Sequence, residues 1–133
     1  MAVPVFDNYT TEPELGSILA EAMRKEILRR GLIRLESPAE AEALVRGTAT
    51  EVKLEPLSFS GQGFTTAYRV RLKVSIRIER QGQIIWKADD VEKDEQFLVE
   101  GTPPDDISTR RKALEKVAGD LMEMLHTMMF EGF

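Results

Sequence analysis

The sequence predicts an α+β fold, a two-layer sandwich with two long amphipathic helices packed on one face of a four-stranded, largely antiparallel sheet. Apolar residues recur with helical spacing near both ends of the chain, over 12–30 and over 106–129. Between them, residues 66–79 alternate strictly between apolar and polar side chains, as in a strand with one buried face. Neither layer can bury its apolar face alone, so we expect the helices and the sheet to pack together.

The composition is that of one globular domain spanning residues 1–133. Hydrophobic residues make up 42 % and charged residues 31 % of the chain, unlike a disordered protein. The chain has no cysteine, which excludes a disulfide framework, a thiolate metal site and a cysteine nucleophile. Its 18 Lys and Arg against 23 Asp and Glu give a net charge of −5, which argues against a general nucleic-acid binder. No apolar run reaches the ~20 residues that span a bilayer.

The first helix has clear start and stop signals. Val3–Phe6 is apolar and predicts a short strand before it. The helix is then predicted over Glu12–Arg30, with Thr11 as the cap and Glu14 completing a capping box. Gly31 follows two arginines and is the expected C-terminal stop, because glycine readily adopts the left-handed conformation.

The centre of the chain is rich in β-forming residues. Leu32–Leu35 predicts a short strand, and Leu44–Leu54 a longer one. Phe59–Gly63 holds two glycines and predicts a loop. Thr66–Glu79 is the clearest strand. Its expected inward-facing residues are Tyr68, Val70, Leu72, Val74, Ile76 and Ile78.

A hairpin is expected to follow this strand. A three-residue loop, Arg80–Gly82, suits it, because a two-residue loop would turn Trp86 toward solvent. The resulting register places Ile84, Trp86 and Ala88 opposite Ile78, Ile76 and Val74, and Lys73 opposite Asp89. The alternation breaks at Asp89 and Asp90, which predicts a bulge or a strand end, and it resumes at Gln96–Val99.

The second long helix is predicted near the C-terminus. Asp105 or Asp106 caps it, and it extends to about Met129. Its apolar stripe consists of Ile107, Leu114, Val117, Ala118, Leu121, Leu125 and Met128. The one histidine, His126, lies on this helix without a nucleophile or carboxylate at a suitable spacing, so we expect an exposed or half-buried position.

Four cations form the candidate binding site: Arg69, Arg71, Lys73 and Arg77 lie on one face of the predicted long strand. In a chain of net charge −5, such a stripe could bind phosphates or an acidic protein surface. The alternative is an ordinary solvated strand face, with Asp89 and its neighbours as cross-strand partners.

No catalytic, cofactor or metal site is predicted. Asp89-Asp90 and Asp94-Glu95 are adjacent carboxylates, but neighbours in a strand point to opposite faces. Neither pair is therefore assembled for acid–base catalysis or metal binding. A small hydrolase using Asp89 or Asp94 remains a distant alternative.

In its order of features, nearly the whole chain resembles the LptE family of lipopolysaccharide-assembly lipoproteins. The matching stretches are Val3–Asn8 with Pro13 and Leu15, the helix at Leu19–Leu28, Ala39–Gly47, Gly61-Gln62 before Tyr68-Arg69-Val70, and Arg110–Leu114 with Leu121. Some members have a basic residue just before the Gly-Gln loop, implicated in lipid A contact; this chain has Ser60 there. The family fold has two helices against a four-stranded sheet, in agreement with the pattern above.

The resemblance implies a non-enzymatic subunit that plugs the LptD barrel, helps that barrel to assemble, and binds lipopolysaccharide during its transport to the outer leaflet. It implies a location on the periplasmic side of the outer membrane, through a lipid anchor on a cysteine. The chain lacks that cysteine, so we expect the signal and anchor to have been removed. A periplasmic lipoprotein module of the TolB-like or penicillin-binding-protein-activator type, binding an envelope protein, is the alternative.

Overall fold

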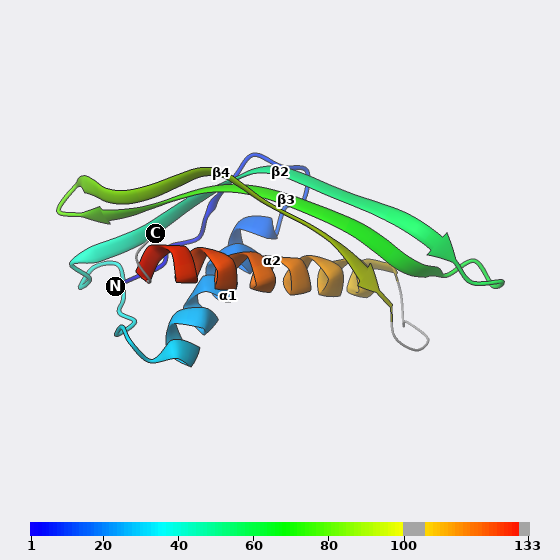
Figure 1. Ribbon diagram of the computed structural model, residues 1–133, viewed down its shortest axis with the longest axis horizontal. Coiled ribbons are helices and arrows are strands. Elements are labelled where there is room, and N and C mark those ends of the chain that lie inside the picture. Colours follow the sequence, from blue (N-terminus) through cyan, green and yellow to red (C-terminus); the bar gives the residue numbers. More distant parts are fainter. Residues whose placement is uncertain (100–105, 131–133) are drawn as a thin grey trace.

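The computed structural model describes residues 1–99 and 106–130 and contains two helices and a four-stranded sheet (Figure 1). The elements are β1 (Asp7–Asn8), α1 (Leu15–Arg30), β2 (Ala43–Phe59), β3 (Thr65–Arg80), β4 (Gln83–Leu98) and α2 (Asp106–Phe130). The strand order is β1-β2-β3-β4. Strands β2, β3 and β4 are antiparallel, but β1 pairs with β2 in parallel. The predicted α+β class is confirmed. The sheet was predicted to be largely antiparallel, but it is mixed.

The strand predicted at Val3–Phe6 is wrong. The first pairing is an isolated bridge between Ala2 and Leu44, and β1 begins only at Asp7. In between, the backbone N–H of Phe6 donates to the Gly16 carbonyl at 3.2 Å. The segment is therefore bonded to the first turn of α1 instead of to a sheet neighbour. Its side chains Val3 and Phe6 are buried, whereas Val5 is 59 % exposed.

Helix α1 begins three residues later than predicted. Glu14 precedes it in a helical conformation and makes no side-chain capping bond, so the predicted capping box does not form. The Asn8 side chain instead donates to the Glu12 carbonyl at 2.6 Å. The predicted stop is confirmed: Gly31 has φ +67° and its N–H donates to Ile27 at 3.2 Å.

The strand Leu32–Leu35 is also wrong, because this segment bonds to the N-terminus at single points. The terminal ammonium donates to the Arg34 carbonyl at 3.0 Å, and Glu36 N–H donates to the Met1 carbonyl at 2.8 Å. Two isolated bonds of this kind hold the segment without forming a ladder.

Strand β3 confirms the alternation that predicted it. The predicted inward residues are all at most 4 % exposed: Tyr68, Val70, Leu72, Val74, Ile76 and Ile78. They join apolar residues of α1, α2 and β2 in one core cluster. In Figure 1 both helices lie beneath the sheet, with α2 running along β3 and β4.

The predicted hairpin register is wrong, because the loop is one residue shorter than predicted and a bulge follows it in β4. Arg80 pairs directly with Gln83 across a two-residue loop, in which Gln81 and Gly82 have φ +52° and +76°, as in a type I′ turn. Ile78 then pairs with Trp86, because Ile85 is an extra residue between two ladder positions. This bulge returns Trp86 to the core side, so the short loop does not expose it.

A second bulge lies at the predicted break in β4. Val74 pairs with Val91 and Ile76 with Ala88, which leaves two aspartates opposite one residue. Asp90 has φ +52°, and its N–H donates to the Ser75 hydroxyl at 3.0 Å. The strand continues without interruption to Leu98. The second helix is confirmed over Asp106–Phe130. Asp106, one of the two predicted caps, is its first helical residue, and the other, Asp105, lies outside the described residues.

Candidate functional site: the outer face of the sheet

The four predicted cations lie on the face of β3 that points away from the core. Their neighbours along the strand are buried, while Arg69, Arg71, Lys73 and Arg77 keep 33–55 % of their side-chain surface exposed. The stripe that the sequence predicted therefore exists as a solvated surface. Neither helix covers it in Figure 1.

The two arginines nearest the β2–β3 loop are held by carboxylates of β4. Arg69 donates to both oxygens of Asp94, at 3.0 and 2.9 Å. Arg71 contacts Glu92 at 2.9 Å and Asp94 at 3.3 Å. The hydrogen bonds and charge of Arg69, with those of Arg71, lower the pKa of Asp94 from its ordinary value. These arginines are thus already neutralised at neutral pH.

Lys73 is paired with the other neighbouring strand, at 3.2 Å from Glu51 of β2. Its predicted partner, Asp89, is one of the two bulge residues and instead contacts Lys87 at 3.4 Å. Glu92 is the residue that stands opposite Lys73 in β4. These first three cations are paired with carboxylates of neighbouring strands, as predicted, but the bulge changes which carboxylate stands opposite Lys73.

Arg77 differs from the other three cations in its partner. It contacts Glu79 of its own strand at 2.9 Å, and Arg46 of β2 contacts the same carboxylate at 2.9 Å. The hydrogen bond from Arg77 is the main cause that lowers the pKa of Glu79. Arg46 and Lys87 stand directly opposite Arg77 in β2 and β4. Neither residue could be placed beside Arg77 from the sequence, because their position depends on the register of three strands.

Of the two adjacent carboxylate pairs, Asp94 and Glu95 point to opposite faces as expected, whereas Asp89 and Asp90 lie together in the second bulge. Asp94 faces outward, whereas Glu95 faces Asp120 of α2. Burial raises the pKa of Glu95, and its hydrogen bond to Asp120 raises it further. In residues 1–99 and 106–130, no group of three His, Asp or Glu side chains is arranged to hold a metal ion.

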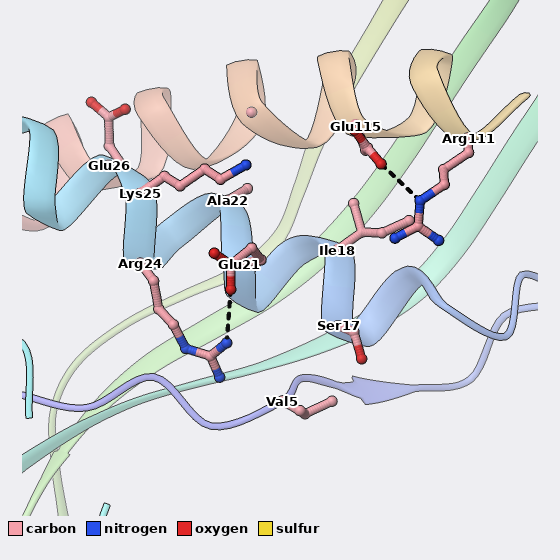
Figure 2. Close-up of a pocket in the computed structure, with 11 residues that line it drawn as sticks. Val5, Ser17, Ile18, Glu21, Ala22, Arg24, Lys25, Glu26, Arg111 and Glu115 are labelled. Carbon is pink, nitrogen blue, oxygen red and sulfur yellow. Dashed lines mark hydrogen bonds and ion pairs between the residues drawn. The ribbon is translucent and has the colours of Figure 1, made fainter. Parts of the chain in front are cut away.

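A cleft of about 480 Å³ lies along α1 and α2, and Figure 2 shows its lining. Four of its charged side chains form two ion pairs within the lining. Arg24 contacts Glu21 at 3.2 Å and donates to the Val3 carbonyl at 2.6 Å, and Arg111 contacts Glu115 at 2.8 Å. The bond from Arg24 fastens the N-terminal segment to α1, and the two ion pairs each lie within one helix, which is a structural use of the charges.

His126 is not half-buried or exposed as predicted. It is 1 % exposed, and its ring centroid lies 4.6 Å from that of Phe130. The reason is its place on α2, one turn after the buried Met122, on the face that enters the core. Neither described helix is both long and apolar enough to cross a bilayer.

Several solved structures share the fold at low sequence identity. A protein from Caulobacter crescentus CB15 described as a lipoprotein has a TM-score of 0.59 and 16 % identity, covering 91 % of this chain and 84 % of its own. PelC from Paraburkholderia phytofirmans, solved as a dodecamer, has a TM-score of 0.59 and 17 % identity, covering 92 % and 82 %. A minor lipoprotein from Acinetobacter baumannii has a TM-score of 0.50 and 16 % identity, covering 93 % and 85 %. These similarities establish the fold alone.

The comparison by sequence is more specific. A search among curated proteins gives no match. The family described as LptE: Lipopolysaccharide-assembly matches residues 1–129, almost the whole chain. The match confirms the resemblance inferred from the order of motifs, and the chain belongs to the LptE lipopolysaccharide-assembly family.

Proposed function

We propose that this protein is a non-enzymatic, lipid-anchored subunit on the periplasmic side of the outer membrane. It plugs an LptD-like β-barrel, helps that barrel to assemble, and binds lipopolysaccharide during transport to the outer leaflet. The family match over residues 1–129 is the observation that carries the proposal. Two helices on one face of the sheet would leave the charged outer face available to the ligand or the barrel.

The outer-face cations Arg69, Arg71, Lys73 and Arg77 are the proposed contacts for the phosphates of lipopolysaccharide. A phosphate oxygen accepts charge-assisted hydrogen bonds from arginine with the same geometry as a carboxylate. Each cation already contacts a carboxylate, so a phosphate would replace that partner. Exposed ion pairs of this kind are worth only about 0–1 kcal/mol, and their exchange is therefore inexpensive.

The plug role predicts a stable complex with a barrel. When the protein is co-expressed with the LptD-like barrel of its own genome, we expect the two to elute together in mild detergent. The measurement is size-exclusion chromatography after affinity capture of the barrel, with an unrelated outer-membrane barrel as the control. Separate elution from the LptD-like barrel would contradict the plug role, and capture of a different envelope protein would favour the activator type of module.

The ligand role predicts salt-sensitive binding to purified lipopolysaccharide, because exposed charges are screened by salt. Replacing Arg69, Arg71, Lys73 and Arg77 with glutamine is expected to weaken binding by about tenfold, roughly 1.4 kcal/mol. A variant with Lys25, Lys112 and Lys116 changed to glutamine removes helix cations and serves as control. Unchanged binding by the first variant would place the ligand elsewhere, and no binding by the native protein would refute the ligand role.

A further inference from the structure

Three cations stand side by side across the sheet at the end near the β3–β4 turn. Arg46 of β2 is the direct partner of Arg77 in β3, and Arg77 is the direct partner of Lys87 in β4. Neighbouring strands lie about 4.8 Å apart, so this cation row spans about 10 Å. Its side chains are 43, 34 and 62 % exposed.

The three cations of the row contact only two carboxylates, Glu79 and Asp89. Like charges directly opposite each other destabilise a sheet, and here two such pairs share one residue. A single carboxylate, Glu79, serves both Arg46 and Arg77 at 2.9 Å. Lys87 has Asp89 at 3.4 Å, but both side chains are more than 60 % exposed, so that pair contributes little.

The opposite half of the outer face is balanced. It contains the cations Lys53, Arg69, Arg71 and Lys73 and the carboxylates Glu51, Glu55, Glu92 and Asp94. An anion that binds there must displace a carboxylate already in place. At the cation row, an added phosphate would relieve repulsion between the cations, which makes the row the more favourable position.

Exposed apolar side chains adjoin the cation row. The next ladder position toward the turn pairs Glu79 with Ile84, which is 56 % exposed. Ile85, the extra residue of the first bulge, is 57 % exposed. A ligand with a phosphate at the cation row could therefore lay alkyl chains over these isoleucines, where the burial of apolar surface adds to binding.

We infer that Arg46, Arg77 and Lys87 form a binding site for the phosphate of an amphiphile, with Ile84 and Ile85 contacting its alkyl part. The inference deepens the proposed function and rests on it, since lipopolysaccharide is the phosphorylated amphiphile concerned. The proposed phosphate contacts then lie in one row across β2, β3 and β4, instead of along the whole length of β3. Arg77 is the residue common to this row and the stripe predicted from the sequence.

Two matched triple variants test the site. One changes Arg46, Arg77 and Lys87 to glutamine, and the other changes Arg69, Arg71 and Lys73, so that both remove three outer-face charges. Binding of purified lipopolysaccharide is measured by calorimetry after circular dichroism has confirmed folding. The first variant is expected to bind at least about tenfold more weakly, and the second less than about threefold. A variant with Arg46→Lys and Arg77→Lys keeps the three charges and is expected to bind lipopolysaccharide more tightly than the glutamine variant of the cation row.

Further probes identify the chemistry that the site recognises. Dephosphorylated lipopolysaccharide should bind equally to the native protein and the cation-row variant. The double variant Ile84→Ser with Ile85→Ser should bind lipopolysaccharide more weakly, while its affinity for inorganic phosphate should stay unchanged. If inorganic phosphate binds the row as tightly as lipopolysaccharide does, the site takes free anions and the amphiphile assignment is wrong.

The outcomes separate this inference from the proposed function. If the variant of Arg69, Arg71 and Lys73 lost as much affinity for lipopolysaccharide as the cation-row variant, or more, the assignment of the site to the cation row would be wrong. The ligand role of the protein would still stand. No binding of lipopolysaccharide by the native protein would refute the ligand role itself, and the site with it.

Discussion

Gly16→Ala is expected to lower the free energy of unfolding by about 2–4 kcal/mol, because a methyl group has no space at this position. A Cβ atom at residue 16 would lie 2.3 Å from the carbonyl oxygen of Phe6. That contact is to backbone, which a side-chain rotation cannot relieve. Phe6 is 2 % exposed, and its N–H donates to Gly16. Urea denaturation followed by circular dichroism measures the loss.

Gly119→Ala is the matched control, because it also places alanine in a helix. At residue 119 no atom beyond the adjoining helix backbone lies within 4 Å of an added Cβ, and alanine has the higher helix propensity. A gain of about 0.5–1 kcal/mol is therefore expected. If Gly16→Ala instead raised the denaturation midpoint, as Gly119→Ala is expected to do, the close approach of Phe6 to α1 would not limit the side chain at residue 16.

Glu26→Gln is expected to cost about 2–3 kcal/mol at pH 7, because it removes the charged acceptor of a part-buried network. Glu26 is 8 % exposed and accepts from Arg29 and from Arg30, the latter at 2.8 Å. Arg30 also donates to the hydroxyl of Thr127 in α2 at 2.9 Å. The carboxylate therefore orients the arginine that joins the two helices. Thermal and urea unfolding measure the change.

The cost of Glu26→Gln is expected to depend on pH. Burial raises the pKa of Glu26, but hydrogen bonds and charge from Arg29 and Arg30 outweigh it and leave the pKa below the ordinary 4.5. A lowered pKa in the folded state gives stability that is present above about pH 4.5 and is lost as pH falls through the folded value. The gap between native protein and variant should shrink over that range.

The control for this prediction is Glu21→Gln, which removes a carboxylate from the same helix. Its side chain is 55 % exposed and contacts Arg24 at 3.2 Å, so we expect less than about 0.5 kcal/mol. A difference between Glu26→Gln and the native protein that stays constant below pH 4.5 would show that the charge of Glu26 does not act in the folded state.

Sequence patterns predicted the elements whose burial is periodic. The alternation over β3 gave its inward residues correctly, because each of them packs into the same core. The register beyond it could not be predicted, because the insertion of Ile85 into β4 leaves no mark in a pattern of apolar and polar residues. The indole of Trp86 lies on the predicted side of the sheet, but the loop has two residues instead of the predicted three.

The candidate site was predictable along one strand but not across strands. The cations of β3 lie outward as expected, since alternation within a strand is local. Arg46 and Lys87 are 41 residues apart in sequence and meet at Arg77 only through two pairings. The short parallel strand β1 was also missed, because two residues paired with Thr48 and Ala49 carry too little periodicity to detect.

The contact between Arg30 and Thr127 joins residues 97 positions apart, whereas β2, β3 and β4 follow one another through short turns. Contacts between distant segments carry the larger loop-closure entropy and tend to form late. Interactions absent from the transition state for folding act mainly on the unfolding rate. The arginine that joins the helices would then control the lifetime of the folded protein, while the speed of folding would depend on the three antiparallel strands.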